Sequence, residues 1–131
     1  MTQLPYADFV KGLCKPGTEI VGSMTPHAAH LIHMTMGVSG EAGELLDAIK
    51  KHTMYNKPLD VDNVIEEIGD VLFYLTGIAN ALGFTLDDCA QVNAEKLSKR
   101  YSEGKYSDKQ AQERADKTER KFMTDAGNDE T

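Results

Sequence analysis

The segment GEAGELLDAIKK, residues 40–51, combines helix-forming residues with an acidic pair, Glu41 and Glu44, set three positions apart. At about 100° of rotation per residue, this spacing puts both carboxylates on one face of a helix, beside its apolar stripe. Downstream, EEIGD repeats the arrangement with Glu67 and Asp70. The sequence therefore predicts two acidic pairs on two helices that also carry the core.

Capping residues place the first of these helices. Thr25 followed by Pro26 is typical of an N-cap and a first helical position, so the helix starts there and runs towards Lys51. Each glycine inside a helix costs about 1 kcal/mol relative to alanine. We therefore expect a close approach by a neighbouring element, or a kink, at the three interior glycines, Gly37, Gly40 and Gly43.

Two further helices follow from the same signals. Asp60 or Asp62 can cap the second helix, whose apolar positions repeat at a helical period, and Gly83 suits its end. Thr85 opens the third helix, which continues to about Tyr101. A short connection between the first two helices favours antiparallel packing.

The remaining organisation is simple. A short lead precedes the first helix, and a weak helical spacing after the third helix predicts a fourth, carried by Ala111, Ala115 and Phe122. We expect one helical domain over residues 1–123 and a disordered C-terminal tail over residues 124–131. The predicted fold class is all-α, a bundle of four to five helices completed by homo-oligomerisation, because 131 residues supply only a modest core.

Charge and composition exclude several classes of function. The chain has 14 Lys plus Arg against 21 Asp plus Glu, a net charge of -7, which repels a nucleic-acid polymer or an anionic membrane surface. The longest apolar run, VLFYLTGIANALGF, is shorter than the roughly 20 residues that a membrane span needs. Cys14 and Cys89 have no zinc-site spacing. We expect a soluble, cytoplasmic protein with reduced thiols.

Antiparallel packing of the first two helices would bring the four carboxylates together at the edge of the core. Such a cluster repels itself, and a divalent cation is the best explanation for keeping it. Carboxylate oxygens favour Mg²⁺ or Mn²⁺, and Mg²⁺ habitually completes its shell with water and substrate phosphates. Acidic pairs are also common on solvated helix faces, and that alternative stays open.

Other polar residues share these faces. His30 and Lys51 lie on the face of the first acidic pair, and Tyr74 lies on the face of the second. In NAEKLSKRY, the third helix gathers complementary groups on one face, Asn93, Lys96 and Arg100. Lysine and arginine suit phosphate oxygens, although cations also favour a helix C-terminus through its dipole.

Taken in order, EAGE at 41–44, EIGD at 67–70 and NAEKLSKRY resemble the MazG-like, all-α nucleoside triphosphate pyrophosphohydrolases over about residues 25–116. The resemblance implies four metal ligands, Glu41, Glu44, Glu67 and Asp70. It implies phosphate contacts from Lys96 and Arg100, with Asn93 and Tyr74 as pocket residues. One departure is Gly40, where many members carry a further Glu.

The family resemblance also implies a reaction. Members split a nucleoside triphosphate between the α and β phosphates into a monophosphate and pyrophosphate, with Mg²⁺ as the cofactor and Mn²⁺ as a substitute. Glu41 or Glu44 would accept the proton from the attacking water. Apart from the resemblance, the shared helix face makes His30 and Lys51 candidates for substrate contact. Nucleotide-pool cleansing and assembly as a homodimer or homotetramer are further expectations. The alternative is a non-catalytic module for oligomerisation or nucleotide binding.

Overall fold

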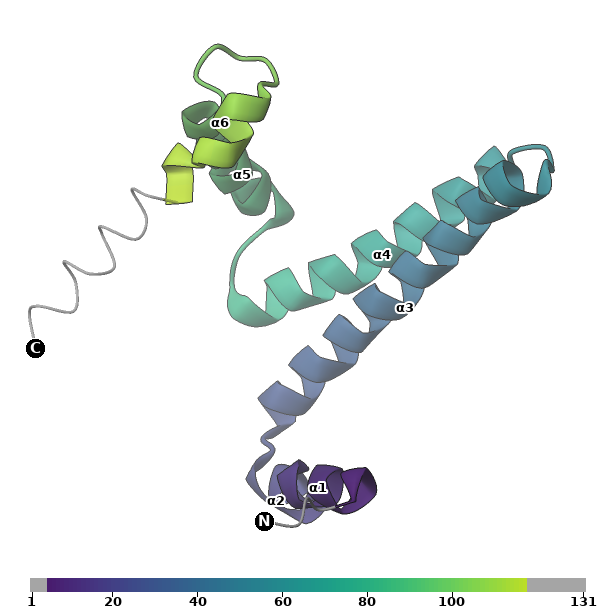
Figure 1. Cartoon of the computed structure of the whole chain (residues 1–131), viewed down its shortest axis with the longest axis vertical. Helices are drawn as coiled ribbons and strands as arrows, with labels where there is room; N and C mark the ends of the chain where they lie inside the picture. Colours follow the sequence, from purple (N-terminus) through teal and green to yellow (C-terminus); the bar gives the residue numbers. More distant parts are fainter. Residues whose placement is uncertain (1–4, 118–131) are drawn as a thin grey trace, which may run out of the picture. The chain divides into compact units, whose positions relative to one another are not determined.

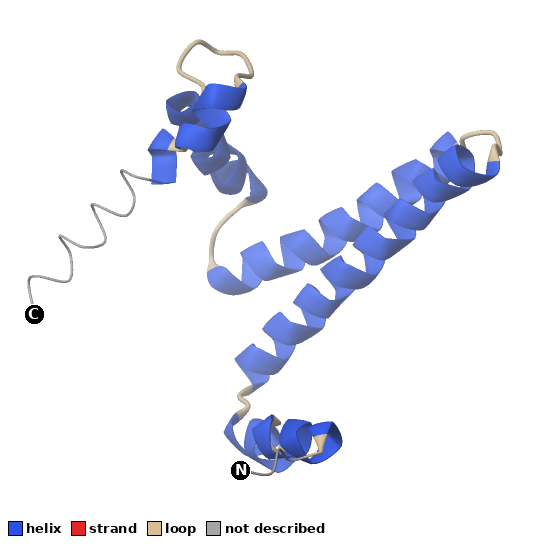
Figure 2. Ribbon diagram, in the orientation of Figure 1, coloured by secondary structure: helices blue, strands red, loops and turns tan. Residues whose placement is uncertain are grey.

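The computed structural model describes residues 5–117, which form six α-helices with no strand among them (Figure 1). In chain order these are α1 (Tyr6–Leu13), α2 (Gly17–Ser23), α3 (Pro26–Tyr55), α4 (Val61–Leu82), α5 (Leu86–Arg100) and α6 (Asp108–Glu113). Figure 2 shows only helices and connecting loops over this part of the chain, which confirms the all-α prediction. The chain divides into two compact units between Ala81 and Leu82.

Helix α3 begins where the sequence predicts. Thr25 Oγ1 accepts a hydrogen bond from the backbone N–H of Ala28 at 3.0 Å, and Pro26 occupies the first helical turn, where its missing donor costs nothing. The helix continues for 30 residues to Tyr55, one turn beyond the predicted end. Asn56, with φ 52°, ends it in the left-handed conformation that asparagine tolerates.

Helix α4 follows after a short connection. Asp60 Oδ1 accepts a hydrogen bond from the backbone N–H of Asn63 at 3.1 Å, so Asp60 caps the helix. Gly83 adopts φ 80° directly after the helical end at Leu82, a conformation that favours glycine. The predicted bounds of this helix are confirmed.

Helices α3 and α4 form an antiparallel hairpin that interlocks through small residues (Figure 1). The Tyr74 ring lies against Gly37, so closely that a methyl group added at Gly37 would overlap the ring. Met34 packs against Gly77 in the same way, and a Cβ at Gly77 would lie 2.5 Å from the Met34 sulfur. Each glycine thus provides a hole for a large side chain of the facing helix.

The other two interior glycines of α3 behave differently. Nothing lies within 4 Å of a Cβ built at Gly40 or Gly43, and the helix passes both without interruption. The expected close approach is therefore confirmed at Gly37 alone, and the expectation is wrong at Gly40 and Gly43.

The lead segment is more ordered than predicted. It contains the short helices α1 and α2, which follow Pro5 and Pro16 and have no side-chain hydrogen bond at their N-caps. Without a Ser, Thr, Asp or Asn cap, the sequence carries only a weak start signal for either helix. These two helices were therefore not predicted.

The second unit contains α5 and α6. Thr85 and Asp88 form the capping box predicted for α5, with reciprocal hydrogen bonds of 3.1 and 2.9 Å. Helix α6 starts after Ser107 and stops before Arg114, whose φ of 49° breaks it. The predicted fourth helix is thus short. Its expected residue Phe122 and the predicted tail 124–131 lie outside the described residues, and the single domain over 1–123 stays a prediction.

Little of the described chain is buried. The buried apolar residues among positions 5–117 are Met34, Ala48 and Ala79. In the same part of the chain, no single helix is long and apolar enough to cross a membrane, and α4 and α5 reach that threshold only when counted together. The hairpin therefore carries a core that is small for its length.

Candidate metal and nucleotide site

The hairpin brings acidic side chains of both helices together. One carboxylate oxygen each of Glu41, Glu67 and Asp70 lies within 4.8 Å of the others. The cause is the register fixed by the interlocked glycines, because one turn from the Gly37–Tyr74 contact towards the connecting loop sets Glu41 opposite Asp70. The predicted convergence of the two acidic pairs is found for these three side chains.

The fourth predicted ligand, Glu44, stands one turn further along α3. It is exposed and is not among the three side chains whose oxygens converge. Its charge nevertheless contributes to the electrostatics of the cluster, since it helps to raise the pKa of Glu67. Glu44 is therefore close enough to act on the cluster without belonging to its closest group of oxygens.

Glu67 is the most perturbed member of the cluster. Burial raises the pKa of its carboxyl group, and the neighbouring Glu41, Asp70 and Glu44 raise it further, in that order. Its Oε2 atom is buried and has no hydrogen-bond partner among the described residues. A buried carboxylate oxygen without a donor is costly, and a cation is the usual partner that removes the cost.

The donor set fits a hard divalent cation. All three converging groups are carboxylates, and oxygen ligands of this kind favour Mg²⁺, Mn²⁺ or Ca²⁺ over zinc or copper. The orphaned Glu67 oxygen points to the same conclusion, because the acidic groups around it cannot donate a proton while they are ionised.

Lys51, a predicted substrate contact, forms an ion pair with Asp47. Its ammonium group pairs with Asp47 at 3.1 Å, and this carboxylate raises the pKa of Lys51, with a smaller contribution from Glu44. The pair is exposed, so it is worth little in stability. Sequence reasoning missed Asp47, although its position four residues before Lys51 is the ordinary signal for a pair on one helix.

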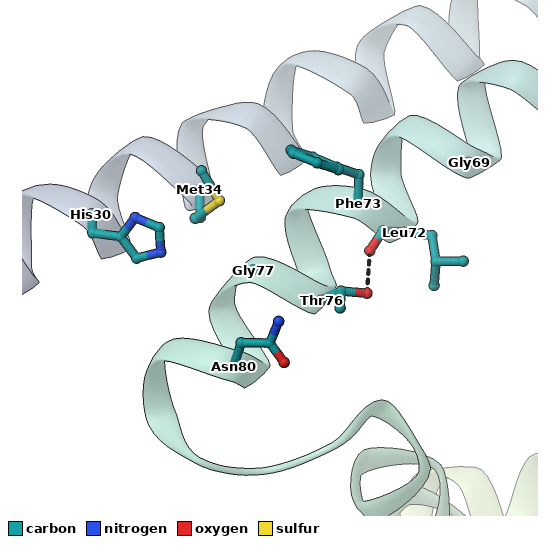
Figure 3. Close-up of a pocket in the computed structure, with 8 residues that line it drawn as sticks. All are labelled: His30, Met34, Gly69, Leu72, Phe73, Thr76, Gly77 and Asn80. Atoms are coloured by element: carbon teal, nitrogen blue, oxygen red, sulfur yellow. Dashed lines mark hydrogen bonds between the residues drawn. The ribbon is translucent and has the colours of Figure 1, made fainter.

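Tyr74 and His30 lie further along the hairpin. Tyr74 is half-buried against Gly37 and makes an edge-to-face contact with Phe73, with 5.1 Å between ring centroids. Its ring therefore helps to set the helix register. His30 is exposed and borders an open cavity of about 600 Å³ (Figure 3).

This cavity lies between α3 and α4 and is bordered mainly by α4. Its lining residues are His30, Met34, Gly69, Leu72, Phe73, Thr76, Gly77 and Asn80. The sequence analysis did not identify Phe73, Thr76 and Asn80 as candidate site residues. The available signal was their common face on α4, which lies next to the acidic face.

The predicted basic residues belong to the second unit. Asn93 and Lys96 line an open cavity of about 460 Å³ along α5. Arg100 donates from Nε and Nη2 to the two carboxylate oxygens of Asp116, at 3.0 and 3.4 Å. Asp116 is the one buried polar residue among the described positions, and sequence reasoning missed it because no helical spacing connects it to Arg100.

This ion pair has clear electrostatic consequences. The hydrogen bonds from Arg100 lower the pKa of the Asp116 carboxyl group, and the carboxylate in turn raises the pKa of Arg100. Two of the five guanidinium N–H donors are used in the pair. A side-chain hydrogen bond with Tyr101 raises the pKa of Arg100 as well.

Comparison with known proteins agrees with this geometry. A family model described as the MazG nucleotide pyrophosphohydrolase domain matches residues 30–104, a range that contains all three converging carboxylates. The gene 37 protein of Mycobacterium phage L5 is 35% identical over 82 residues, which cover 56% of this chain and 68% of the phage protein. No solved structure matches. The chain therefore belongs to the family of MazG nucleotide pyrophosphohydrolase domains.

Proposed function

We propose that this protein is a Mg²⁺-dependent nucleoside triphosphate pyrophosphohydrolase, which cleaves its substrate between the α and β phosphates. One observation carries the proposal: three carboxylates from two helices converge, and a buried oxygen of Glu67 has no partner among the described residues. The family match over the same segment supports this class of reaction. Removal of unwanted nucleotides from the cytoplasmic pool is the role that we infer.

The metal would be held by Glu41, Glu67 and Asp70, with Glu44 as a fourth ligand or as a neighbour of the site. When bound, Mg²⁺ or its substitute Mn²⁺ draws negative charge from phosphate oxygens and lowers the pKa of water. The protein contributes the position of the carboxylates, which the Gly37–Tyr74 packing fixes from outside the cluster.

The proton of the attacking water needs a carboxylate acceptor. Glu44 and Glu41 are the two candidates, and the position of Glu44 outside the three converging oxygens supports its role as the base. The water oxygen would bond to the α-phosphorus while the bond from that phosphorus to the bridging oxygen breaks. Pyrophosphate would leave with the bridging oxygen, and the water proton would pass to the carboxylate.

Basic and polar residues would bind the rest of the substrate. We assign phosphate contacts to Lys96 and Arg100, with Lys51 as a further cation. Contacts to the base or sugar are assigned to a second group, His30, Tyr74 and Asn93. Lys96, Arg100, Asn93 and Tyr74 are assigned from the matched positions of the family pattern. Lys51 and His30 are assigned because they share the helix face of the first acidic pair.

A second copy of the chain would complete the fold. Large apolar side chains are exposed on both hairpin helices: Ile32 is 49% exposed, Leu46 68% and Ile65 62%. Apolar surface of this extent on a short chain is typical of a protein interface. We therefore propose a homodimer or homotetramer, and sedimentation equilibrium of the full chain measures its mass. A monomer at all concentrations would contradict the proposal.

Product analysis tests the reaction. The full chain is incubated with Mg²⁺ and a panel of ribo- and deoxynucleoside triphosphates, and the products are separated by ion-exchange chromatography. Monophosphate with pyrophosphate supports the proposal. Diphosphate with orthophosphate would place the cleavage at another bond, and no product from any substrate would favour a non-catalytic, nucleotide-binding module.

Two variants of neighbouring residues sharpen the test. Glu67→Gln removes a converging carboxylate and should lower kcat by at least about a hundredfold. Glu66→Gln makes the same change on the next residue of α4, which points about 100° away and is exposed, and should leave the activity intact. Equal activity of the two variants would show that the reaction does not depend on the acidic cluster.

A further inference from the structure

The open cavity between α3 and α4 has the dimensions of a ligand site. Its volume of about 600 Å³ falls within the range of small-molecule pockets and exceeds what a single nucleobase needs. Figure 3 shows that His30 and Met34 enter it from α3, while the other labelled residues come from α4. One of these residues is Gly69, where an added Cβ would meet nothing within 4 Å, whereas Met34 fills the space at Gly77.

The lining combines apolar walls with a few polar groups. Met34, Leu72 and Phe73 provide apolar surface, and the Phe73 ring is 66% exposed and so free to stack. The Thr76 hydroxyl donates to the Leu72 carbonyl at 2.7 Å, so its proton is already used (Figure 3). Among the described residues, the His30 ring and the Asn80 amide have no hydrogen-bond partner, so they offer both donors and acceptors.

The cavity also lies at a suitable distance from the acidic cluster. Along α4, Phe73 and Asn80 follow Asp70 by three and ten residues, which at 1.5 Å per residue is about 5 to 15 Å of axial rise. A nucleotide extended from its metal-bound phosphate to the far edge of its base spans a comparable length. A nucleotide whose phosphates face Asp70 would therefore extend its base towards Phe73 and Asn80.

We infer that this cavity binds the nucleobase of the substrate, with Phe73 and Met34 as its walls and Asn80 and His30 as the groups that distinguish one base from another. The inference rests on the proposed function, since it assigns the base of the same nucleotide. Asn80 is the main determinant of specificity. Its amide has a donor and an acceptor side by side, a pattern that matches the polar edge of a base.

Binding and turnover are measured on the full chain. Titration with the four nucleoside monophosphates gives dissociation constants, and hydrolysis of the four triphosphates gives kcat/KM. Asn80→Asp keeps the shape of the side chain but removes its donors, so the ratio between bases should change by about tenfold or more, mainly through KM. Gln91→Glu makes the same chemical change at an exposed position of α5 and is the matched control.

A wall variant gives a second readout. Phe73→Ala should weaken all four monophosphates by about tenfold and leave their ranking unchanged, because stacking depends little on base identity. Unchanged base ratios in Asn80→Asp, together with unchanged affinity in Phe73→Ala, would overturn the inference. That result would also be expected if a second copy of the chain fills the cavity.

The two proposals fail separately in these experiments. If the wild-type chain hydrolyses no triphosphate but binds monophosphates with a base preference that Asn80→Asp alters, the base site stands and the pyrophosphohydrolase proposal is wrong. If the wild type releases pyrophosphate and neither variant differs from the Gln91→Glu control, the reaction stands and the base site is wrong.

Discussion

The contact between Gly37 and Tyr74 makes a sharp prediction about stability. In Gly37→Ala, the new methyl group meets the Tyr74 ring, which must move. Gly40→Ala adds the same methyl group to the same helix one turn away, where nothing lies within 4 Å. The two variants gain the same helix propensity and differ only in what the methyl group touches.

The magnitude follows from these two terms. Replacing glycine by alanine inside a helix stabilises by about 1 kcal/mol, and overpacking a tight contact costs about 1–3 kcal/mol. Gly40→Ala should therefore stabilise the chain by up to about 1 kcal/mol. Gly37→Ala should lie about 1–3 kcal/mol below it, a difference of about 4–12 °C in Tm for a domain of this size.

Thermal and urea unfolding followed by far-ultraviolet circular dichroism measure this difference. A double-mutant cycle with Tyr74→Ala identifies the cause, because the penalty of Gly37→Ala should vanish once the ring is removed. The reasoning is refuted if Gly37→Ala and Gly40→Ala stabilise the protein equally. The Tyr74 ring would then not occupy the hole at Gly37, and the helix register would need another origin.

Three further predictions concern charge. Mg²⁺ should raise the Tm of the wild type at neutral pH and leave that of Glu67→Gln nearly unchanged, as differential scanning fluorimetry with and without a chelator would show. Glu44→Gln should abolish turnover with helicity and assembly preserved; retained activity would remove Glu44 from the essential residues. Asp116 has a lowered pKa in the folded chain, so its contribution to stability is present above its unfolded pKa and is lost as pH falls below about 4. Urea unfolding across that range should show this loss in the wild type and not in Asp116→Asn.

Much of the fold could be predicted because helix ends are local. Thr25 with Pro26, and Thr85 with Asp88, hold their own backbone hydrogen bonds within one turn, so the sequence alone contains the signal. Helices α1 and α2 lack such caps and were missed. The end of α6 at Arg114 was missed as well, since a left-handed arginine has no sequence signature.

For the site, the sequence predicts which face of each helix carries the acidic residues, but not how the two helices are aligned. Helical period puts Glu41 and Glu44 on one face, but the convergence of Glu41 with Glu67 and Asp70 depends on the register between two helices. That register is set by which residue fills which hole, a non-local property. The Arg100–Asp116 pair is non-local too, because it spans 16 residues across a loop.

The register between α3 and α4 determines both the packing of the hairpin and the position of its carboxylates, and the two have opposite effects on stability. Seating Tyr74 on Gly37 stabilises the hairpin, and one turn away it forces the carboxylates together and leaves a Glu67 oxygen buried without a donor. Sliding one helix past the other would relieve the repulsion, but it would also drive Met34 into the backbone around Gly77. The tight contacts therefore hold the carboxylates together despite their mutual repulsion, and a bound cation would remove that repulsion. This explains why tight glycine contacts, and not a softer core that could yield, lie next to the acidic cluster.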